Sequence, residues 1–169
     1  MKKTGIAFGL LLILMAGSAF AGTATNNLNV SATIVPDCTI NSVGSLAFGN
    51  NLGLPFAVNG VDAAASSVIN YTCTNSGVAP AMRLGQGQNF AAGSTDATPL
   101  RRMANGTNYI SYSLYQDNSH TTPWNNTVAT AVSGTANGLV QNVTLYGVAK
   151  ATNVPTGSYS DVVTVSIDF

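Results

Sequence analysis

The chain contains very few charged residues. Of its 169 residues, 6 are Lys or Arg and 6 are acidic, so charged residues make up 7%, whereas about 25% is usual for a soluble domain. All the acidic residues are aspartates, and there is a single histidine. The basic patch typical of nucleic-acid binding is missing, so we expect no nucleic-acid partner. The surface must instead be built from Asn, Ser, Thr and Gly.

A long membrane-spanning run is also lacking. The apolar run from Ile6 to Ala16 has roughly 11 residues, whereas a transmembrane helix needs about 20. Lys2 and Lys3 precede this run, and the small-residue motif Ser18-Ala19-Phe20-Ala21 follows it. Residues 1–21 are therefore predicted to be a secretory signal peptide, with no transmembrane segment after cleavage. The mature chain would carry four cationic side chains and six aspartates, a net charge of about −2.

Only two cysteines are present, Cys38 and Cys73. Export brings them into an oxidising compartment, where a disulfide between them is the expected outcome. Metal binding by the pair is the alternative. It has little support, because His120 is distant in sequence and no cluster of ligands surrounds it. We predict no metal site.

Sustained helical periodicity is absent after the leader, whereas alternation with a period of two recurs between Gly, Asn and Pro breaks. The pattern predicts an all-β domain. Alternating apolar residues occur in the segments from Leu28 to Ile34, from Ile110 to Leu114 and from Val163 to Phe169. Further strands are predicted at Ser45 to Phe48, Ser67 to Cys73, Ala81 to Leu84 and Leu139 to Val148.

Three Asn-Gly dipeptides, at residues 59–60, 105–106 and 137–138, mark tight turns. Two polar stretches, residues 85–98 and 116–138, are predicted to be surface loops with short strands inside them. Several short strands at this spacing suggest a sandwich. The roughly 148 residues after the leader fit one domain.

The sequence contains little evidence of a catalytic site. His120 lies in a polar stretch without a recognisable nucleophile partner, and Asp62, Asp96 and Asp117 have the sequence context of turns. The adjacent Arg101 and Arg102 can bind an anion, but a solvated pair on a loop is the more common arrangement. Trp124 fits packing in the core or a loop better than a sugar-binding platform. We expect neither an enzyme nor a cofactor.

The order of several short motifs resembles the spore coat protein U domain, a family that includes pilin subunits of archaic chaperone/usher pili. The motifs are Cys38-Thr39-Ile40, Leu46-Ala47-Phe48-Gly49, Tyr71-Thr72-Cys73, Arg102-Met103, Tyr112-Ser113-Leu114-Tyr115, Trp124, Tyr146-Gly147 and Gly157-Ser158-Tyr159-Ser160-Asp161.

The resemblance implies an incomplete immunoglobulin-like β-sandwich over residues 36–169, which a donor strand from another subunit completes. A periplasmic chaperone would first fill the open groove with one of its own strands. At an outer-membrane usher, the N-terminal extension, residues 22–35, of another copy or a related pilin would then replace the chaperone strand. In this scheme the donor side chains are Leu28, Val30, Ala32 and Ile34. The strand at the groove edge that pairs with the chaperone carries Val163, Val165, Ile167 and Phe169.

The resulting hypothesis is a subunit of a surface pilus, exported through the periplasm, that supports adhesion and biofilm formation. If Leu28 to Val35 is instead the domain's own first strand, only Gly22 to Asn27 remains as donor. A spore or cell coat protein assembled by the same strand exchange is an alternative function. Further alternatives are a tip adhesin and a self-contained carbohydrate-binding sandwich.

Overall fold

The computed structural model describes residues 21–151 and 153–169. The predicted leader therefore lies outside the described residues except for Ala21. The chain divides into two units, Met1–Thr33 and Ile34–Phe169. Each unit is described by itself below.

In the first unit, residues 21–33 form no strand or helix, and all their side chains are exposed. Leu28 is 87% exposed and Val30 is 86% exposed. The prediction of a strand from Leu28 to Ile34 is therefore wrong for the single chain. The physical reason is that a strand needs a hydrogen-bonding partner, which sequence alternation alone does not supply.

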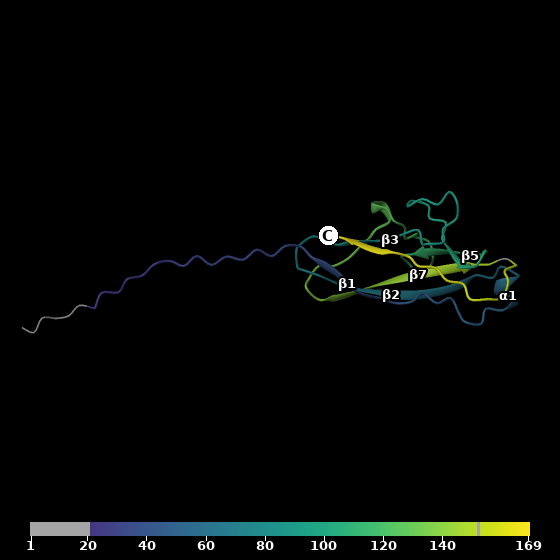
Figure 1. Cartoon of the computed structure of the whole chain (residues 1–169), viewed down its shortest axis with the longest axis horizontal. Coiled ribbons are helices and arrows are strands. Elements are labelled where there is room, and N and C mark those ends of the chain that lie inside the picture. The colour runs from purple at the N-terminus through teal and green to yellow at the C-terminus, as the bar shows by residue number, and fades with distance from the viewer. Residues whose placement is uncertain (1–20, 152) are drawn as a thin grey trace, which may run out of the picture. The chain divides into compact units, whose positions relative to one another are not determined.

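The second unit is almost entirely β-structure, arranged as two antiparallel sheets in two layers (Figure 1). The larger sheet has the strand order β1-β2-β7-β5-β4, and the smaller has the order β6-β3-β8. In chain order, the elements are β1 (Cys38–Val43), α1 (Leu54–Ala57), β2 (Ala63–Cys73), β3 (Ala81–Leu84), β4 (Arg102–Asn105), β5 (Asn108–Tyr115), η1 (Val128–Thr130), β6 (Val132–Ser133), β7 (Val140–Lys150) and β8 (Val165–Asp168). The predicted all-β, immunoglobulin-like sandwich is confirmed.

The central pair of the larger sheet, β2 and β7, runs in register from Ala63 opposite Ala149 to Thr72 opposite Val140. The hairpin between β4 and β5 turns at Gly106, one of the predicted Asn-Gly turns, where φ is 59°. Only a residue tolerant of positive φ fits this turn without strain. None of the helices in the described part of the chain is long and apolar enough to cross a membrane.

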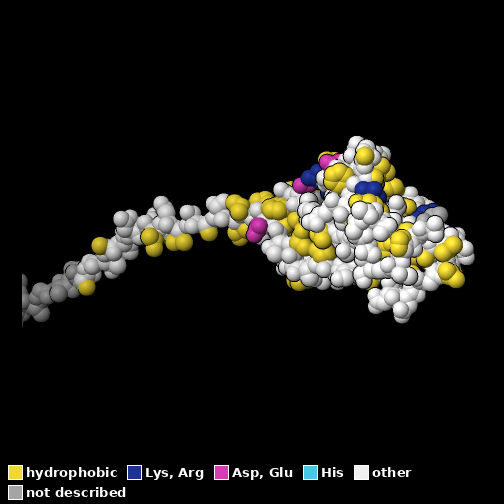
Figure 2. All heavy atoms as spheres, turned by 45° about the vertical axis from the view of Figure 1, so that its right-hand side comes forward, with side chains coloured by type: hydrophobic (Ala, Val, Ile, Leu, Met, Phe, Trp, Pro, Cys, Tyr) yellow, Lys and Arg dark blue, Asp and Glu magenta, His cyan; other side chains and the backbone are white. Residues whose placement is uncertain are grey.

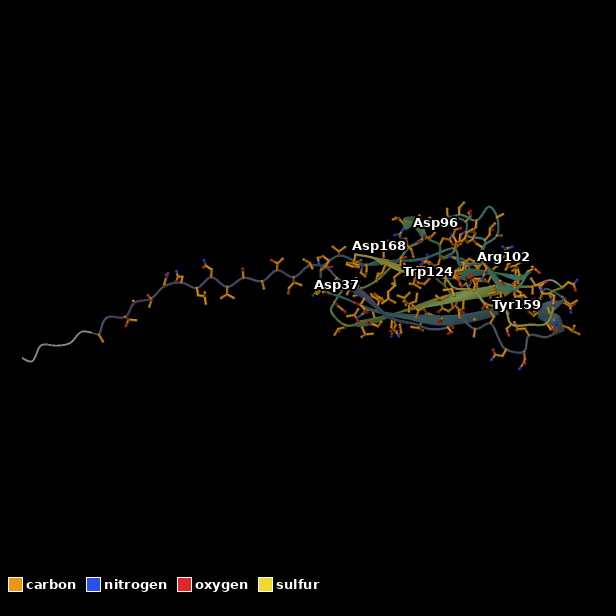
Figure 3. The ribbon with its side chains drawn as sticks, viewed as in Figure 1. Asp37, Asp96, Arg102, Trp124, Tyr159 and Asp168 are labelled. Atoms are coloured by element: carbon orange, nitrogen blue, oxygen red, sulfur yellow. A yellow bond between two sulfur atoms is a disulfide. The ribbon has the colours of Figure 1, made fainter. Side chains whose placement is uncertain are left out.

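The hydrophobic core fills the space between the two sheets. Ile69 and Tyr71 from β2 face Met82 and Leu84 from β3, and all four side chains are at most 1% exposed. Trp124 is completely buried between the layers (Figure 3), and its indole Nε1 donates a hydrogen bond of 3.0 Å to the carbonyl of Met82. Packing in the core is therefore confirmed for Trp124, and a sugar-binding platform at this residue is ruled out.

Candidate functional site: an apolar groove beside the C-terminal strand

A groove of about 840 Å³ opens in the second unit. One rim is the end of β1 with the segment that follows it, residues 43–52, and the other is the segment that leads into β8 with the first residue of that strand, residues 154–165. The floor consists of apolar side chains from both sheets, which the alternating pattern points inward. They include Leu84, Met103, Ile110, Leu114 and Leu145. A groove of this volume with an apolar floor suits an extended apolar segment better than a compact polar ligand.

The strand β8, at the end of the C-terminal rim, is hydrogen-bonded along one edge only. On that edge β8 pairs with β3, from Leu84 opposite Val165 to Ala81 opposite Asp168. The pairing continues irregularly beyond β3, since the amide of Gly85 donates to the carbonyl of Thr164 at 2.9 Å. The other edge of β8 has no partner strand in the part of the chain that the structure describes. An unpaired edge exposes amide and carbonyl groups that another strand can bind.

The four residues predicted for the groove edge do not all lie in the groove. Val163 and Val165 line it, and Ile167 packs against the core without lining it. Phe169 is 54% exposed, because the pairing with β3 ends at Asp168. The predicted strand from Val163 to Phe169 is accordingly shorter, Val165–Asp168.

The opposite rim lies over the larger sheet at Gly147. A Cβ atom on Gly147 would come within 2.7 Å of Leu46 Cδ2 and 3.1 Å of Phe48 Cζ, so the missing side chain makes room for both residues. Phe48 in turn packs against Tyr112, with ring centroids 6.2 Å apart. The segment from Ser45 to Phe48, predicted as a strand, is irregular. The last backbone hydrogen bond to β2 comes just before this segment, where the amide of Gly44 donates to the carbonyl of Val68.

A polar cluster closes one part of the groove. The hydroxyl group of Tyr112 donates to Oδ2 of Asp161, and both residues line the groove. Oδ1 of the same carboxylate accepts from the amides of Gln88 and Asn89 and from the Asn89 side chain. Burial, followed by the bond to Asp161, raises the pKa of Tyr112 far above its ordinary value. The phenol therefore stays protonated and serves as a fixed donor.

The expectation that Arg101 and Arg102 are solvated is wrong for Arg101, whose side chain is only 2% exposed. Its Nε donates to the carbonyl of Gly85, and its Nη2 donates to the carbonyls of Leu84 and Trp124. Burial lowers its pKa to about 10. Sequence reasoning missed this residue because an adjacent arginine pair gives no sign of which side chain points inward. One signal was available. Arg101 lies two residues before Met103, and residues two apart in a strand pattern point to the same face of the sheet.

The predicted disulfide between Cys38 and Cys73 is present. The two residues are the first register pair of β1 and β2, so the cross-link sits where the chain enters the sandwich. The amide of Asp37 donates to Oγ1 of Thr74 at 3.0 Å, which adds a second attachment at the same end. Ile34, the last of the predicted donor residues, precedes these attachments and is 86% exposed.

The remaining polar residues do not assemble a reactive centre. The predicted loop residue Asp117 accepts bonds from the amides of Thr121 and Thr122, and His120 lies edge-on to Tyr115, with ring centroids 5.3 Å apart. Among the described residues, no three His, Cys, Asp or Glu side chains are placed to hold a metal ion.

Comparisons with known proteins support the same architecture. Residues 24–166 match the family described as the Spore Coat Protein U domain. Protein U of Myxococcus xanthus is 42% identical over 161 aligned residues, which cover 89% of this chain and 88% of that protein.

One similar solved structure is the CsuC–CsuE chaperone–tip adhesion subunit pre-assembly complex from the archaic chaperone–usher Csu pili of Acinetobacter baumannii. The match has a TM-score of 0.50 and 19% sequence identity, and it covers 81% of this chain but 40% of the matched chain. At this identity the likeness concerns the fold, and this chain spans less than half the length of that neighbour.

Proposed function

Because this chain belongs to the spore coat protein U domain family, we propose that it is a structural subunit of a surface fibre that grows by donor-strand exchange. The family and the fold are those of structural subunits and not of enzymes. In the proposed pathway the subunit passes through the periplasm with a chaperone strand in its groove. An outer-membrane usher then replaces that strand with the extension of another copy or a related pilin. The resulting pilus would support adhesion and biofilm formation.

One observation carries the proposal: the domain has an open apolar groove beside an unpaired strand edge, and the same chain has an exposed apolar segment with the period of a strand. Leu28, Val30, Ala32 and Ile34 alternate with Asn29, Ser31 and Thr33. In an added strand the first four side chains would point the same way, and the polar ones would face outward. We therefore assign the donor segment to Leu28–Ile34 within residues 22–35.

The free energy of such an exchange is a balance between burial and chain ordering. Burial of each large apolar side chain is worth on the order of 1.5 to 3 kcal/mol, and each new ladder hydrogen bond adds about 1 kcal/mol. Ordering the extension costs about 1 to 2 kcal/mol per residue. Gain and cost are of similar size for a segment of this length, so a strand that fits the groove closely is needed for stable assembly.

The test is refolding of a chain that begins at Asp37, with and without a synthetic peptide covering residues 22–35. The expected result is that the peptide raises the thermal midpoint in a saturable way or is required for recovery of folded monomer. A peptide in which Val30 and Ala32 are replaced by Asp is the matched control and should have no effect. A shortened chain that is stable by itself and ignores the peptide would contradict the proposal.

A second candidate function is a subunit of a spore or cell coat. The observation that favours it is the 42% identity to Protein U together with the description of the family. The groove and the extension would serve the same strand exchange in a coat as in a pilus. Immunogold labelling of cells would separate the two functions, since a pilus subunit lies on filaments that disappear without the usher, whereas a coat subunit follows the surface of the resting cell.

A further inference from the structure

A second hollow, of about 330 Å³, lies on the outer face of the larger sheet. Ser111 and Ser113 line it, and they alternate along β5 with the buried Ile110, Tyr112 and Leu114. These two serines therefore point away from the core and from the groove. The remaining wall is formed by Ala91, Pro99, Leu100, Arg101, Arg102 and Tyr112, the last of which also borders the groove.

Two cationic side chains lie in one row across this face. Arg102 on β4 is opposite Ser111 on β5, and Ser111 is opposite Lys150 on β7. Neighbouring strands are about 4.8 Å apart, so the row spans about 10 Å. The described residues contain four Lys and Arg side chains. Of these, Arg101 is buried and Arg83 forms an ion pair of 2.6 Å with Asp168. The other two both belong to this row. Figure 2 shows how sparse charged side chains are on the face that it draws.

The guanidinium group of Arg102 is already held in place. Its Nε donates to the carbonyl of Asn89 at 3.0 Å, and its Nη2 donates to the carbonyl of Phe90 at 2.9 Å. Its central carbon lies 3.9 Å above the ring centre of Tyr109. These contacts use no carboxylate, and Nη1 has no hydrogen-bond partner among the residues that the structure describes. An immobilised arginine loses little further entropy when it binds an anion, which favours recognition of a planar carboxylate.

The acidic residue that faces the row is Asp62. Its carboxylate lies 3.3 Å from Nζ of Lys150, and both side chains are largely exposed. An exposed pair of this kind is worth at most about 1 kcal/mol. Lys150 can therefore exchange Asp62 for an external carboxylate. The row as a whole keeps a net positive charge, since it has two cations and one aspartate.

We propose that this hollow binds a uronic acid unit of an acidic polysaccharide. The carboxylate of the sugar would pair with Arg102, which lines the hollow, and with Lys150, which lies on the same face of the sheet just outside it. The hydroxyl groups of Ser111 and Ser113 would exchange hydrogen bonds with the sugar hydroxyls. Leu100 lines the hollow and is 47% exposed, so it supplies apolar contact for the sugar ring, while Tyr109 lies beside the hollow with its ring against Arg102. The volume of the hollow matches one sugar ring rather than an extended peptide.

Strand exchange does not use the side chains assigned to this site, because Arg102, Lys150, Ser111 and Ser113 do not line the groove, although Tyr112 borders both hollows. A chain that polymerises normally can fail the following test, and a chain that does not polymerise can pass it. The two proposals are therefore distinguishable.

The experiment is calorimetric titration of the full secreted chain with tetragalacturonate, compared with the same oligosaccharide as its methyl ester. The acid should bind, with an affinity that falls as salt rises, and the ester should bind at least tenfold more weakly. Arg102→Gln should weaken binding at least tenfold. Asp62→Asn should strengthen it several-fold, because it frees Lys150. Arg83→Gln, which removes a cation elsewhere, should leave the affinity unchanged.

Arg102 also holds the loop at Asn89 in place. The Arg102→Gln result is therefore read together with its thermal midpoint, which should equal that of the natural chain. Asp62→Asn does not touch the hollow and keeps the test decisive if that variant misfolds. Equal binding of the acid and the ester, or an Asp62→Asn variant with unaltered affinity, would overturn the proposal. Tighter binding of an oligoaspartate peptide than of the uronate would also overturn it, in favour of an acidic protein partner.

Discussion

The hydroxyl group of Tyr112 and the carboxylate of Asp161 are 2.6 Å apart and join β5 to the segment that leads into the C-terminal strand. Through Asn89, which donates to Asp161 and accepts from Arg102, the same contact reaches the other face of the sheet. This cluster anchors the C-terminal rim next to the bridge in which Ser160 and Ala104 of β4 exchange two backbone hydrogen bonds.

Replacing Tyr112 with Phe should therefore destabilise the domain by about 1 to 2 kcal/mol, because Oδ2 of Asp161 loses its donor in a part-buried setting. Urea unfolding of the two proteins measures the difference. Tyr146→Phe is the matched control, since no hydrogen bond joins the Tyr146 hydroxyl to the described residues, and it should change the free energy of unfolding by less than about 0.5 kcal/mol. Equal effects of both substitutions would show that the bond to Asp161 does not anchor the rim.

Arg101→Met should cost at least about 2 kcal/mol in the free energy of unfolding. The methionine fills a similar volume, but the carbonyls of Leu84, Gly85 and Trp124 lose donors in the interior. Arg83→Met is the comparison, because Arg83 takes part in an exposed ion pair worth at most about 1 kcal/mol. If Arg101→Met is as stable as Arg83→Met, these three bonds do not contribute to stability as inferred.

Asp117 should make acid stability depend on its own titration. Backbone hydrogen bonds from Thr121 and Thr122 lower its pKa to about 2, whereas an unfolded aspartate has a pKa of about 3.9. The unfolded chain binds this proton first as pH falls, so the contribution is complete above about pH 5 and is lost on acidification towards pH 2. Asp117→Asn should have a lower thermal midpoint than the natural chain at pH 7. The difference between the two thermal midpoints should disappear at pH 2. A gap that stays constant with pH would contradict this assignment.

Gly147→Val should disturb the groove without touching its polar anchor. The new side chain would press against Leu46 and Phe48 and lift the rim that they form. We expect about 1 to 3 kcal/mol of destabilisation from overpacking and at least tenfold weaker binding of the donor peptide. Ala64→Val, on the exposed face of β2, is the control and should leave peptide binding unaltered. Normal peptide affinity in the Gly147→Val chain would mean that the rim accommodates the extra volume.

Local patterns in the sequence predicted those parts of the fold that depend on local chemistry. The strand at Ala81–Leu84 has the predicted bounds, and the turn at Gly106 follows from the positive φ that Asn-Gly dipeptides favour. The pairing of Cys38 with Cys73 followed from there being two cysteines in an exported chain.

Features that depend on a partner strand were less predictable. Residues 28–34 and 45–48 alternate like strands, yet neither segment has a ladder partner in the single chain. Val163 is excluded from β8 for a related reason, because β3 ends at Leu84 and supplies no further ladder position. The groove itself is lined by residues more than 100 positions apart, such as Phe48 on one rim and Val163 on the other, and no local pattern specifies that arrangement.

The place of the disulfide has a mechanical consequence. In a fibre of the proposed kind, tension on each subunit enters through the extension and reaches the sandwich at Cys38. The cross-link passes that load directly to Cys73 at the end of β2, which is paired on both sides, so the ladder between β1 and β2 is not peeled open from its loaded end. Single-molecule pulling should accordingly find a lower unfolding force after reduction of the disulfide, and an unchanged force would mean that the load takes another route.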